Sequence, residues 1–254
     1  MSLITDPSAV ALALAAVFII SFMKGAFGGG AATVGIPLLA LAMDPLTAGA
    51  LLAPLLVVMD VFALRYFTPS TWSWLDLARL LPSMILGIAV GYFALRLMNP
   101  HMAEIAIALT TLAFTVQWFL KRGNVTVVPG ASPVLAAIAG FSSGVTTMVA
   151  HAGGPPTAMY LLRRGLGKQA FAGTMSITFA AGNLIKLPPW LLVAEKPEGF
   201  AWLMVACLPA IPLAVGLGWR LHNWLDEKRL FQLCYALLTA TSLKLLWDGV
   251  AGLT

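Results

Sequence analysis

Long apolar runs alternate with short polar segments along almost the whole chain. They predict helices at about 8–24, 31–43, 46–67, 77–98, 102–120, 132–150, 154–163, 169–192, 200–221 and 230–250. A membrane-spanning helix needs roughly 20 residues, so 31–43 and 154–163 are too short to cross unaided. Each is strongly tilted, is completed by irregular backbone, or is a re-entrant half-helix. The pattern predicts an all-α polytopic membrane protein with one membrane domain, 1–254.

The composition agrees with a membrane protein. Hydrophobic residues make up 60% of the chain and charged residues 10%, against roughly 25% charged residues in soluble domains. The basic residues stand singly or in pairs at the ends of apolar runs, which is typical of residues that set membrane topology and not of nucleic-acid binding. We therefore expect the protein to have the lipid bilayer as a partner and not to bind nucleic acid. A homo-oligomer is compatible with this composition.

The two halves of the chain resemble each other. A shift of 119 positions gives six identical pairs within 19 positions, and a shift of 127 positions gives four further pairs. The first set includes Gly25 with Gly144, Gly35 with Gly154 and Pro37 with Pro156, and the second pairs Leu81 with Leu208, Pro82 with Pro209, Leu86 with Leu213 and Gly91 with Gly218. These offsets indicate a tandem duplication, with repeats at about 8–121 and 132–250.

The distribution of Lys and Arg predicts the topology. With ten segments and an outside N-terminus, 11 of the 15 fall on one side: Lys24, Arg65, Arg79, Lys121, Arg122, Arg163, Arg164, Lys168, Arg220, Lys228 and Arg229. The other side receives Arg96, Lys186, Lys196 and Lys244. A model with eight segments places Lys24 within a span and divides the other 14 residues 7 against 7. Positive charge stays in the cytoplasm, so both termini are expected outside an inner (cytoplasmic) membrane. Five segments per repeat, an odd number, make the repeats inverted.

Two glycine-rich stretches interrupt the helices at matching places in the repeats and suggest a substrate site. Glycine permits close backbone approach, proline suits a first helical turn, and free N–H groups at two converging helix starts would attract a carboxylate or a sulfur oxyanion. The candidate binding residues are Lys24, Gly25, Gly28, Gly29, Gly30, Thr33, Ser142, Ser143, Gly144, Thr146, Thr147, His151, Gly153, Gly154 and Thr157. Alternatively, the small residues only let helices pack closely.

Three ionisable side chains each have a functional interpretation and a structural one. Lys24 either attracts the anion or extends to the lipid headgroups. His151 either donates to an oxyanion or carries a proton, or it is a hydrogen-bonded structural histidine. Asp60 lies opposite the part of the second repeat that holds Asn183 and Lys186, where it could couple transport to protons. Its place near the cytoplasmic end favours an interfacial role instead.

Tryptophans near the predicted helix ends are expected to anchor the protein at the membrane interfaces. They include Trp72, Trp74, Trp190, Trp202, Trp219, Trp224 and Trp247. No Walker motif occurs, and no β-strand precedes the stretch GAFGGG. The three histidines lack the spacing of a metal site. We expect no catalytic residue, no cofactor and no metal.

The stretches FMKGAFGGGAATVGIPLL and FSSGVTTMVAHAGGPPTAMYLL, with the following LGKQAFAGT, resemble the TauE/SafE sulfite exporter family, also called TSUP. The resemblance implies a permease for small sulfur-containing anions such as sulfite, sulfoacetate or other sulfonates, and for small carboxylates in some members. Together with the repeats it predicts a secondary transporter that works by alternating access at a mid-membrane site between the repeats. The alternative is a membrane-embedded accessory or assembly protein that does not transport.

Overall fold

The computed structural model describes residues 7–29, 39, 43, 45–97, 105, 108–109, 112, 116, 132–193 and 198–252, and among these it has helices and turns but no strand. The helices are α1 (Pro7–Phe27), α3 (Pro45–Ala63), the short 3-10 helix η2 (Pro69–Thr71), α4 (Trp74–Leu97), α6 (Pro133–Ala150), α7 (Gly154–Arg163), α8 (Lys168–Val193), α9 (Phe200–Cys207), α10 (Ala210–Trp224) and α11 (Glu227–Ala251). The predicted helices 31–43 and 102–120 lie almost entirely outside the described residues.

The structure confirms the all-helical class, and the described helices follow the predicted ranges closely. The segment predicted at 200–221 divides into α9 and α10 at Pro209, because proline cannot supply the N–H that a continuous helix needs there. Four stretches are long and apolar enough to cross a membrane: Pro7–Phe27, Leu46–Ala63, Trp74–Leu95 and Phe200–Trp224. The chain is therefore a multi-pass membrane protein.

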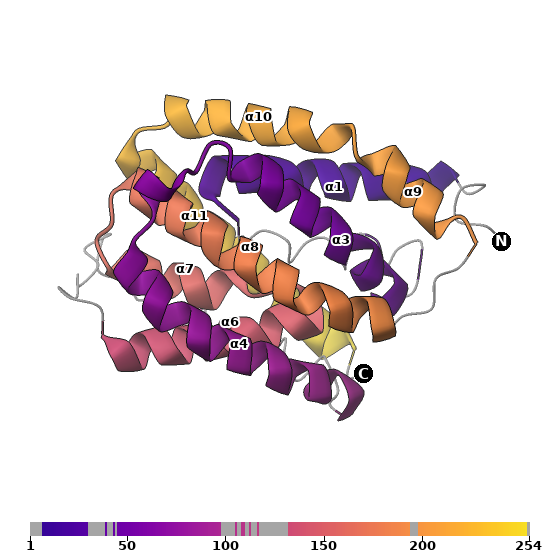
Figure 1. The fold of residues 1–254 in the computed structure, drawn as a ribbon, viewed down its shortest axis with the longest axis horizontal. Coiled ribbons are helices and arrows are strands. Elements are labelled where there is room, and N and C mark those ends of the chain that lie inside the picture. The colour runs from indigo at the N-terminus through magenta and orange to yellow at the C-terminus, as the bar shows by residue number, and fades with distance from the viewer. Residues whose placement is uncertain are drawn as a thin grey trace.

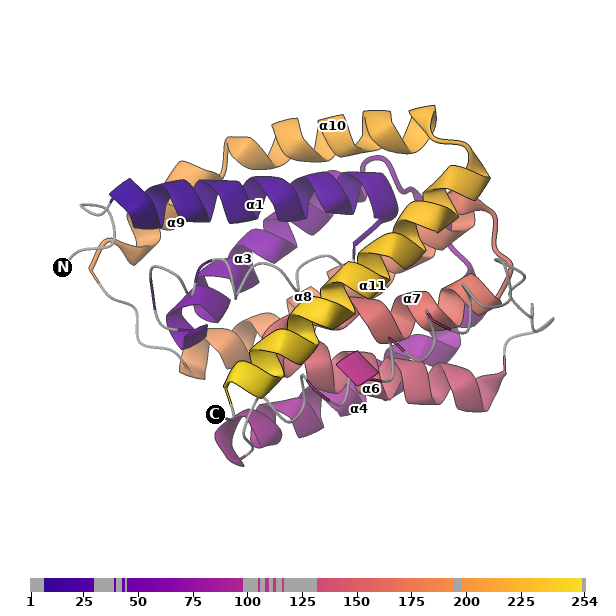
Figure 2. The same ribbon diagram turned by 180° about the vertical axis from the view of Figure 1, so that it is seen from behind.

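The helices form three layers (Figures 1 and 2). One outer layer holds α1 and α10, the opposite outer layer holds α4 and α6, and α3 and α8 lie between them. The helix α11 crosses this middle layer diagonally, on the side that faces the viewer in Figure 2. The central helices α3 and α8 pack on each other, and Asp60 of α3 and Asn183 and Lys186 of α8 are buried.

Glycines bring the outer helix pairs into close contact. A Cβ atom at Gly25 on α1 would overlap the carbonyl oxygen of Val215 on α10, and one at Gly144 on α6 would overlap the carbonyl oxygen of Met84 on α4. No larger side chain fits at these crossings, so their small residues let the backbones approach.

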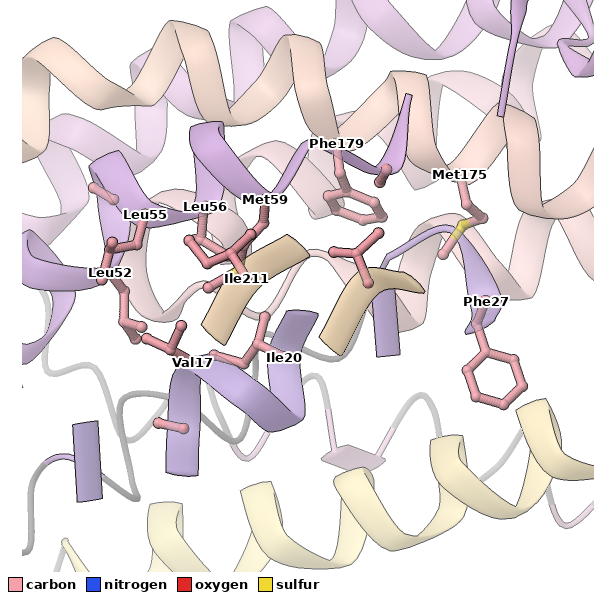
Figure 3. Packing of buried hydrophobic residues seen from close by; sticks show 14 of the residues in the cluster. Val17, Ile20, Phe27, Leu52, Leu55, Leu56, Met59, Met175, Phe179 and Ile211 are labelled. Atoms are coloured by element: carbon pink, nitrogen blue, oxygen red, sulfur yellow. The ribbon is translucent and has the colours of Figure 1, made fainter. Parts of the chain in front are cut away.

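An apolar core fills the space where α1, α3, α8 and α10 meet (Figure 3). Val17 and Ile20 of α1 lie close to Leu56 and Met59 of α3 and to Ile211 of α10, and all five are buried. Asp60 follows Met59 directly, and Lys24 comes one helical turn after Ile20. The apolar core therefore borders the polar residues described next.

Candidate functional site

Polar and charged side chains from four parts of the chain meet inside the helix bundle. The group, here called the charged cluster, consists of Lys24 on α1, Asp60 on α3, Thr147 on α6, His151 between α6 and α7, and Asn183 and Lys186 on α8. Each of these residues is at most 3% exposed. Charged groups inside a membrane protein are costly to bury and commonly mark a functional site.

One side of the charged cluster is an ion pair that links α1, α3 and α8. Lys24 Nζ donates to Asp60 Oδ1, and both side chains are almost fully buried. Asn183 Nδ2 donates to the other carboxylate oxygen of Asp60 at 2.6 Å. Both oxygens of Asp60 thus accept hydrogen bonds, as expected of an ionised carboxylate.

The other side of the charged cluster is built around Lys186. Its Nζ donates to the Thr147 hydroxyl at 2.8 Å and to the Thr147 carbonyl at 3.2 Å, and lies 2.7 Å from His151 Nδ1. An ammonium group at this position would place one N–H on each of these three partners. Among the described residues Lys186 makes no ion pair, so its charge has no carboxylate of its own.

His151 takes its position from the break between α6 and α7. Its backbone has φ 53°, and it is the only non-glycine residue with a positive φ among those described. The ring nitrogen Nε2 lies 3.0 Å from the carbonyl oxygen of Gly49, so it donates there while Nδ1 accepts from Lys186. This arrangement makes His151 a neutral imidazole. A left-handed conformation costs a histidine about 1–2 kcal/mol, which the surrounding contacts must offset.

Trp190 and Gly49 hold the other face of His151. The Trp190 ring lies on the His151 ring with centroids 5.0 Å apart. A Cβ atom at Gly49 would overlap the Trp190 ring, so a glycine is required where α3 passes α8. Trp190 is 1% exposed, and its Nε1 has no hydrogen-bond partner among the described residues.

The hydroxyls of the second glycine-rich stretch bond mainly within the turn from α6 to α7. Ser143 Oγ donates to the Gly153 carbonyl at 2.8 Å, Thr157 Oγ1 donates to Ser143 Oγ at 2.9 Å, and Thr146 Oγ1 donates to the Ala152 carbonyl at 3.1 Å. These bonds fix the start of α7. Two of its first residues are prolines, which leaves fewer free N–H groups at this helix start than the sequence pattern alone implies.

The first glycine-rich stretch is described as far as Gly29. Gly28 and Gly29 end α1 with φ values of 77° and 130°, and they lie against Ala172 and Phe179 of α8. Both dihedrals are strained for any other residue. The candidate residues Gly30 and Thr33 lie outside the described residues.

The remaining candidate residues lie away from the charged cluster or beside it. Gly25 and Gly144 lie at the helix crossings, which fits the packing interpretation of these two glycines. Ser142 is half-buried on α6, and Gly153 and Gly154 begin α7. Of the candidate residues, the structure brings Lys24, Thr147 and His151 together with Asp60.

Four sequence-based expectations are corrected by burial. Asp60 is not exposed to the membrane surface and Lys24 does not extend to the headgroups, because the two side chains form a buried ion pair. Lys186 is 1% exposed and is not a loop charge. Trp190 is a buried contact of His151 and not an interfacial anchor, whereas Trp74, Trp202, Trp224 and Trp247 are exposed.

Sequence reasoning did not include Lys186 and Asn183 among the binding residues. The signal was present, because the two polar residues stand three positions apart in an otherwise apolar run, which places them on one face of a helix. Among the described residues, no group of three His, Cys, Asp or Glu side chains lies close enough together to hold a metal ion.

Apolar helices that enclose a buried charged cluster define a class of protein, the multi-pass helical membrane proteins with a polar site in their interior. Residues 13–245 match the family model described as sulfite exporter TauE/SafE, and the chain therefore belongs to this family of transporters. Comparison with curated proteins gave no match, and comparison with solved structures gave none.

Proposed function

We propose that the protein is a secondary transporter of small, sulfur-containing anions such as sulfite, sulfoacetate or another organosulfonate, in the inner (cytoplasmic) membrane. The family supports transport of a sulfur anion. The chain's own residues support an anion as the substrate, and the following paragraphs give that support.

The observation that carries the proposal is the unpaired charge of Lys186. Its ammonium group is 1% exposed and bonds only to neutral acceptors among the described residues. An isolated buried cation is costly, and a bound anion would remove most of that cost. An oxyanion would reach Lys186 by replacing the Thr147 carbonyl, which makes the longest of the three bonds at 3.2 Å.

The start of α7 contributes to the same proposed site. His151 contacts Lys186 and stands three positions before Gly154, the first residue of α7, so the positive end of that helix lies near Lys186. The hydroxyls of Ser143, Thr146 and Thr157 hold this helix start in place. In this proposal Lys186 supplies the charge, and the glycine-rich stretch supplies a fixed backbone around the anion.

Equivalent contacts in the two halves support two inverted repeats within one membrane domain, at about 8–121 and 132–250. Gly25 on α1 contacts Val215 on α10, and Gly144 on α6 contacts Ile88 on α4. The 119-residue offset relates the two glycines, and the 127-residue offset relates Ile88 to Val215. In Figure 1, α1 and α6 run in opposite directions, as do α4 and α10, which an inverted pair of repeats requires.

The basic residues support the proposed orientation. The helices α3, α7 and α10 end, and α4, α8 and α11 begin, at the same end of the bundle (Figure 1). Arg65, Arg79, Arg163, Arg164, Lys168, Arg220, Lys228 and Arg229 stand at these helix ends. Lys24 and Lys186 are buried, so neither counts among the Lys and Arg residues of the loops. Removing one from each side leaves ten basic residues on one side and three on the other. This end is the proposed cytoplasmic side, with both termini at the other side.

Burial of the charged cluster supports alternating access. Each residue of the cluster is at most 3% exposed, so an anion can enter or leave only after helices move apart. The cluster joins α1 and α3 of the first repeat to α6 and α8 of the second. A rocking motion of one repeat against the other would open this contact to each side in turn.

Counterflow in liposomes tests the proposal. Purified protein is reconstituted with one unlabelled anion inside, and uptake of the labelled anion is followed for sulfite, sulfoacetate, taurine, thiosulfate and simple carboxylates. We expect saturable counterflow for at least one sulfur oxyanion and little for taurine, whose amine cancels its charge. Counterflow of carboxylates alone would assign the protein to a different substrate class. No counterflow of any anion would favour an accessory protein without transport.

A further inference from the structure

The charged cluster contains an internal counter-ion, and its charges can be counted from the hydrogen bonds. Lys24 and Asp60 form an ion pair and cancel, and His151 is neutral. The proposed function assigns Lys186 the ammonium form that binds the anion. The described residues of the cluster therefore carry a net charge of one positive unit.

We propose that this site prefers anions with a single negative charge to dianions such as sulfoacetate, and that Asp60 sets this preference by neutralising Lys24. The inference rests on the proposed function, because it assigns the charge of the substrate at the same site. A monoanion neutralises the cluster, whereas a dianion leaves one negative charge buried in the protein without a partner, which is unfavourable.

Asp60 is placed to act as a fixed anion within the site. Its two oxygens hold Lys24 of the first repeat and Asn183 of the second, the latter at 2.6 Å. Asn183 and Lys186 stand on one face of α8, three positions apart. The carboxylate of Asp60 therefore lies beside Lys186, to which the substrate binds in this proposal. Because Asp60 neutralises Lys24, a bound monoanion has only the charge of Lys186 to neutralise.

Unpartnered donors near the cluster point to a ligand. Ser21 stands one turn before Lys24 on α1, and Ser176 stands two turns before Asn183 on α8. Both hydroxyls, like Nε1 of Trp190, are buried and have no hydrogen-bond partner among the described residues. Buried polar groups nearly always have partners. Ser21 and Trp190 each stand one helical turn from a lysine of the cluster, so an acceptor atom of a bound ligand would satisfy these two donors.

The test is a change of charge at Asp60. Proteoliposomes are assayed by counterflow for ethanesulfonate, which carries one negative charge, and for sulfoacetate, which also has two carbons but carries two negative charges. The two anions differ only in that sulfoacetate has a carboxylate where ethanesulfonate has a methyl group. The wild-type protein is expected to prefer ethanesulfonate. Asp60→Asn frees the charge of Lys24 and raises the cluster to two positive units, so the ratio of sulfoacetate to ethanesulfonate transport should rise by about tenfold or more.

Two further variants separate charge from structural damage. Lys24→Met leaves the cluster with no net charge, so counterflow of both anions should fall by about tenfold or more. The double variant Lys24→Met/Asp60→Asn restores one positive unit, and its ratio should return toward that of the wild type. Asp248→Asn makes the same acid-to-amide change in the exposed ion pair with Lys244, and it should leave the ratio unchanged.

The experiment distinguishes failure of the charge inference from failure of the proposed transport function. A wild-type protein that prefers sulfoacetate, or an Asp60→Asn variant with an unchanged ratio, overturns the inference while anion transport stands. A double variant that behaves like Asp60→Asn also overturns it, because its charge is that of the wild type. If Asp60→Asn does not fold, Lys24→Met decides, and unchanged transport in that variant contradicts the charge count. A wild-type protein that moves no anion contradicts the proposed function itself.

Discussion

His151 and Lys186 form the contact on which the site depends at the scale of single residues. The 2.7 Å approach between them is held from two sides, by Thr147 on α6 and by Gly49 on α3. The Trp190 ring covers the His151 ring and leaves no room for a side chain at position 49. The position of the cation thus depends on a glycine that belongs to neither glycine-rich stretch.

We predict that Gly49→Ala destabilises the protein and weakens anion transport. The added methyl group would overlap the six-membered part of the Trp190 ring and displace it from His151. Such overpacking costs roughly 1–3 kcal/mol, although alanine is the better helix former. Thermal unfolding in detergent and counterflow measure the two effects. Trp190→Phe removes the overlapping ring atoms, so a Gly49→Ala/Trp190→Phe variant no more stable than Gly49→Ala would contradict this explanation.

The sequence predicted part of the site because some of its signals are local. Lys24 and His151 are charged or titratable residues next to glycine-rich stretches, which marks them as candidates in the sequence. The alignment of the repeats places Asp60 opposite Asn183 and Lys186. The ion pair of Lys24 with Asp60 was not predictable, since the two residues are 36 positions apart and their approach depends on how α1 packs on α3. Depth along one helix suggested an interfacial Asp60, but the burial of this residue comes from neighbouring helices.

At the scale of helices, glycine crossings join the two halves of the chain. Gly218 on α10 contacts the backbone of Phe22 and Ala26 on α1, and Gly91 on α4 contacts Val145 on α6. The helix α4 crosses α6 with glycines on both sides, since Gly87 and Gly144 contact each other. The helix ranges were predictable from apolar periodicity, whereas these pairings depend on contacts that no single helix encodes.

We predict that Gly218→Ala lowers the thermal unfolding temperature and that Gly216→Ala does not. A methyl group at Gly218 would overlap the carbonyl oxygen of Phe22, whereas the nearest atom to one at Gly216 is Tyr66 Oη at 3.5 Å. Both glycines stand on α10, so their gain in helix propensity, roughly 1 kcal/mol, is the same. Equal unfolding temperatures for the two variants would mean that close approach of α1 and α10 does not stabilise the fold.

At the scale of the whole molecule, charged networks tie the two halves together at more than one depth. Besides the charged cluster, buried Asp76 of α4 accepts from Tyr160 Oη at 2.6 Å and from Arg164 Nε at 2.8 Å. This network lies where α4 begins and α7 ends, at the end of the bundle that is rich in basic residues. A rocking movement of the repeats would have to open it on the proposed cytoplasmic side.

We predict that residues 70 and 198 face opposite sides of the membrane. Ser70 is exposed in η2 at the basic end, and Glu198 is exposed in the turn before α9. In a background without Cys207 and Cys234, a membrane-impermeant maleimide should label Glu198→Cys in intact cells and Ser70→Cys only after permeabilisation. Labelling of both variants from the same side would contradict the ten-segment topology.

The central claim is that Lys186 holds the substrate anion, and counterflow with Lys186→Met tests it most directly. Lys244→Met is the matched control, because Lys244 forms an exposed ion pair with Asp248 on α11. Both variants should fold, as checked by size-exclusion chromatography and thermal unfolding. We predict that Lys186→Met lowers sulfur-oxyanion counterflow by more than about tenfold while Lys244→Met transports like the wild type. Wild-type counterflow in a folded Lys186→Met variant would contradict the account.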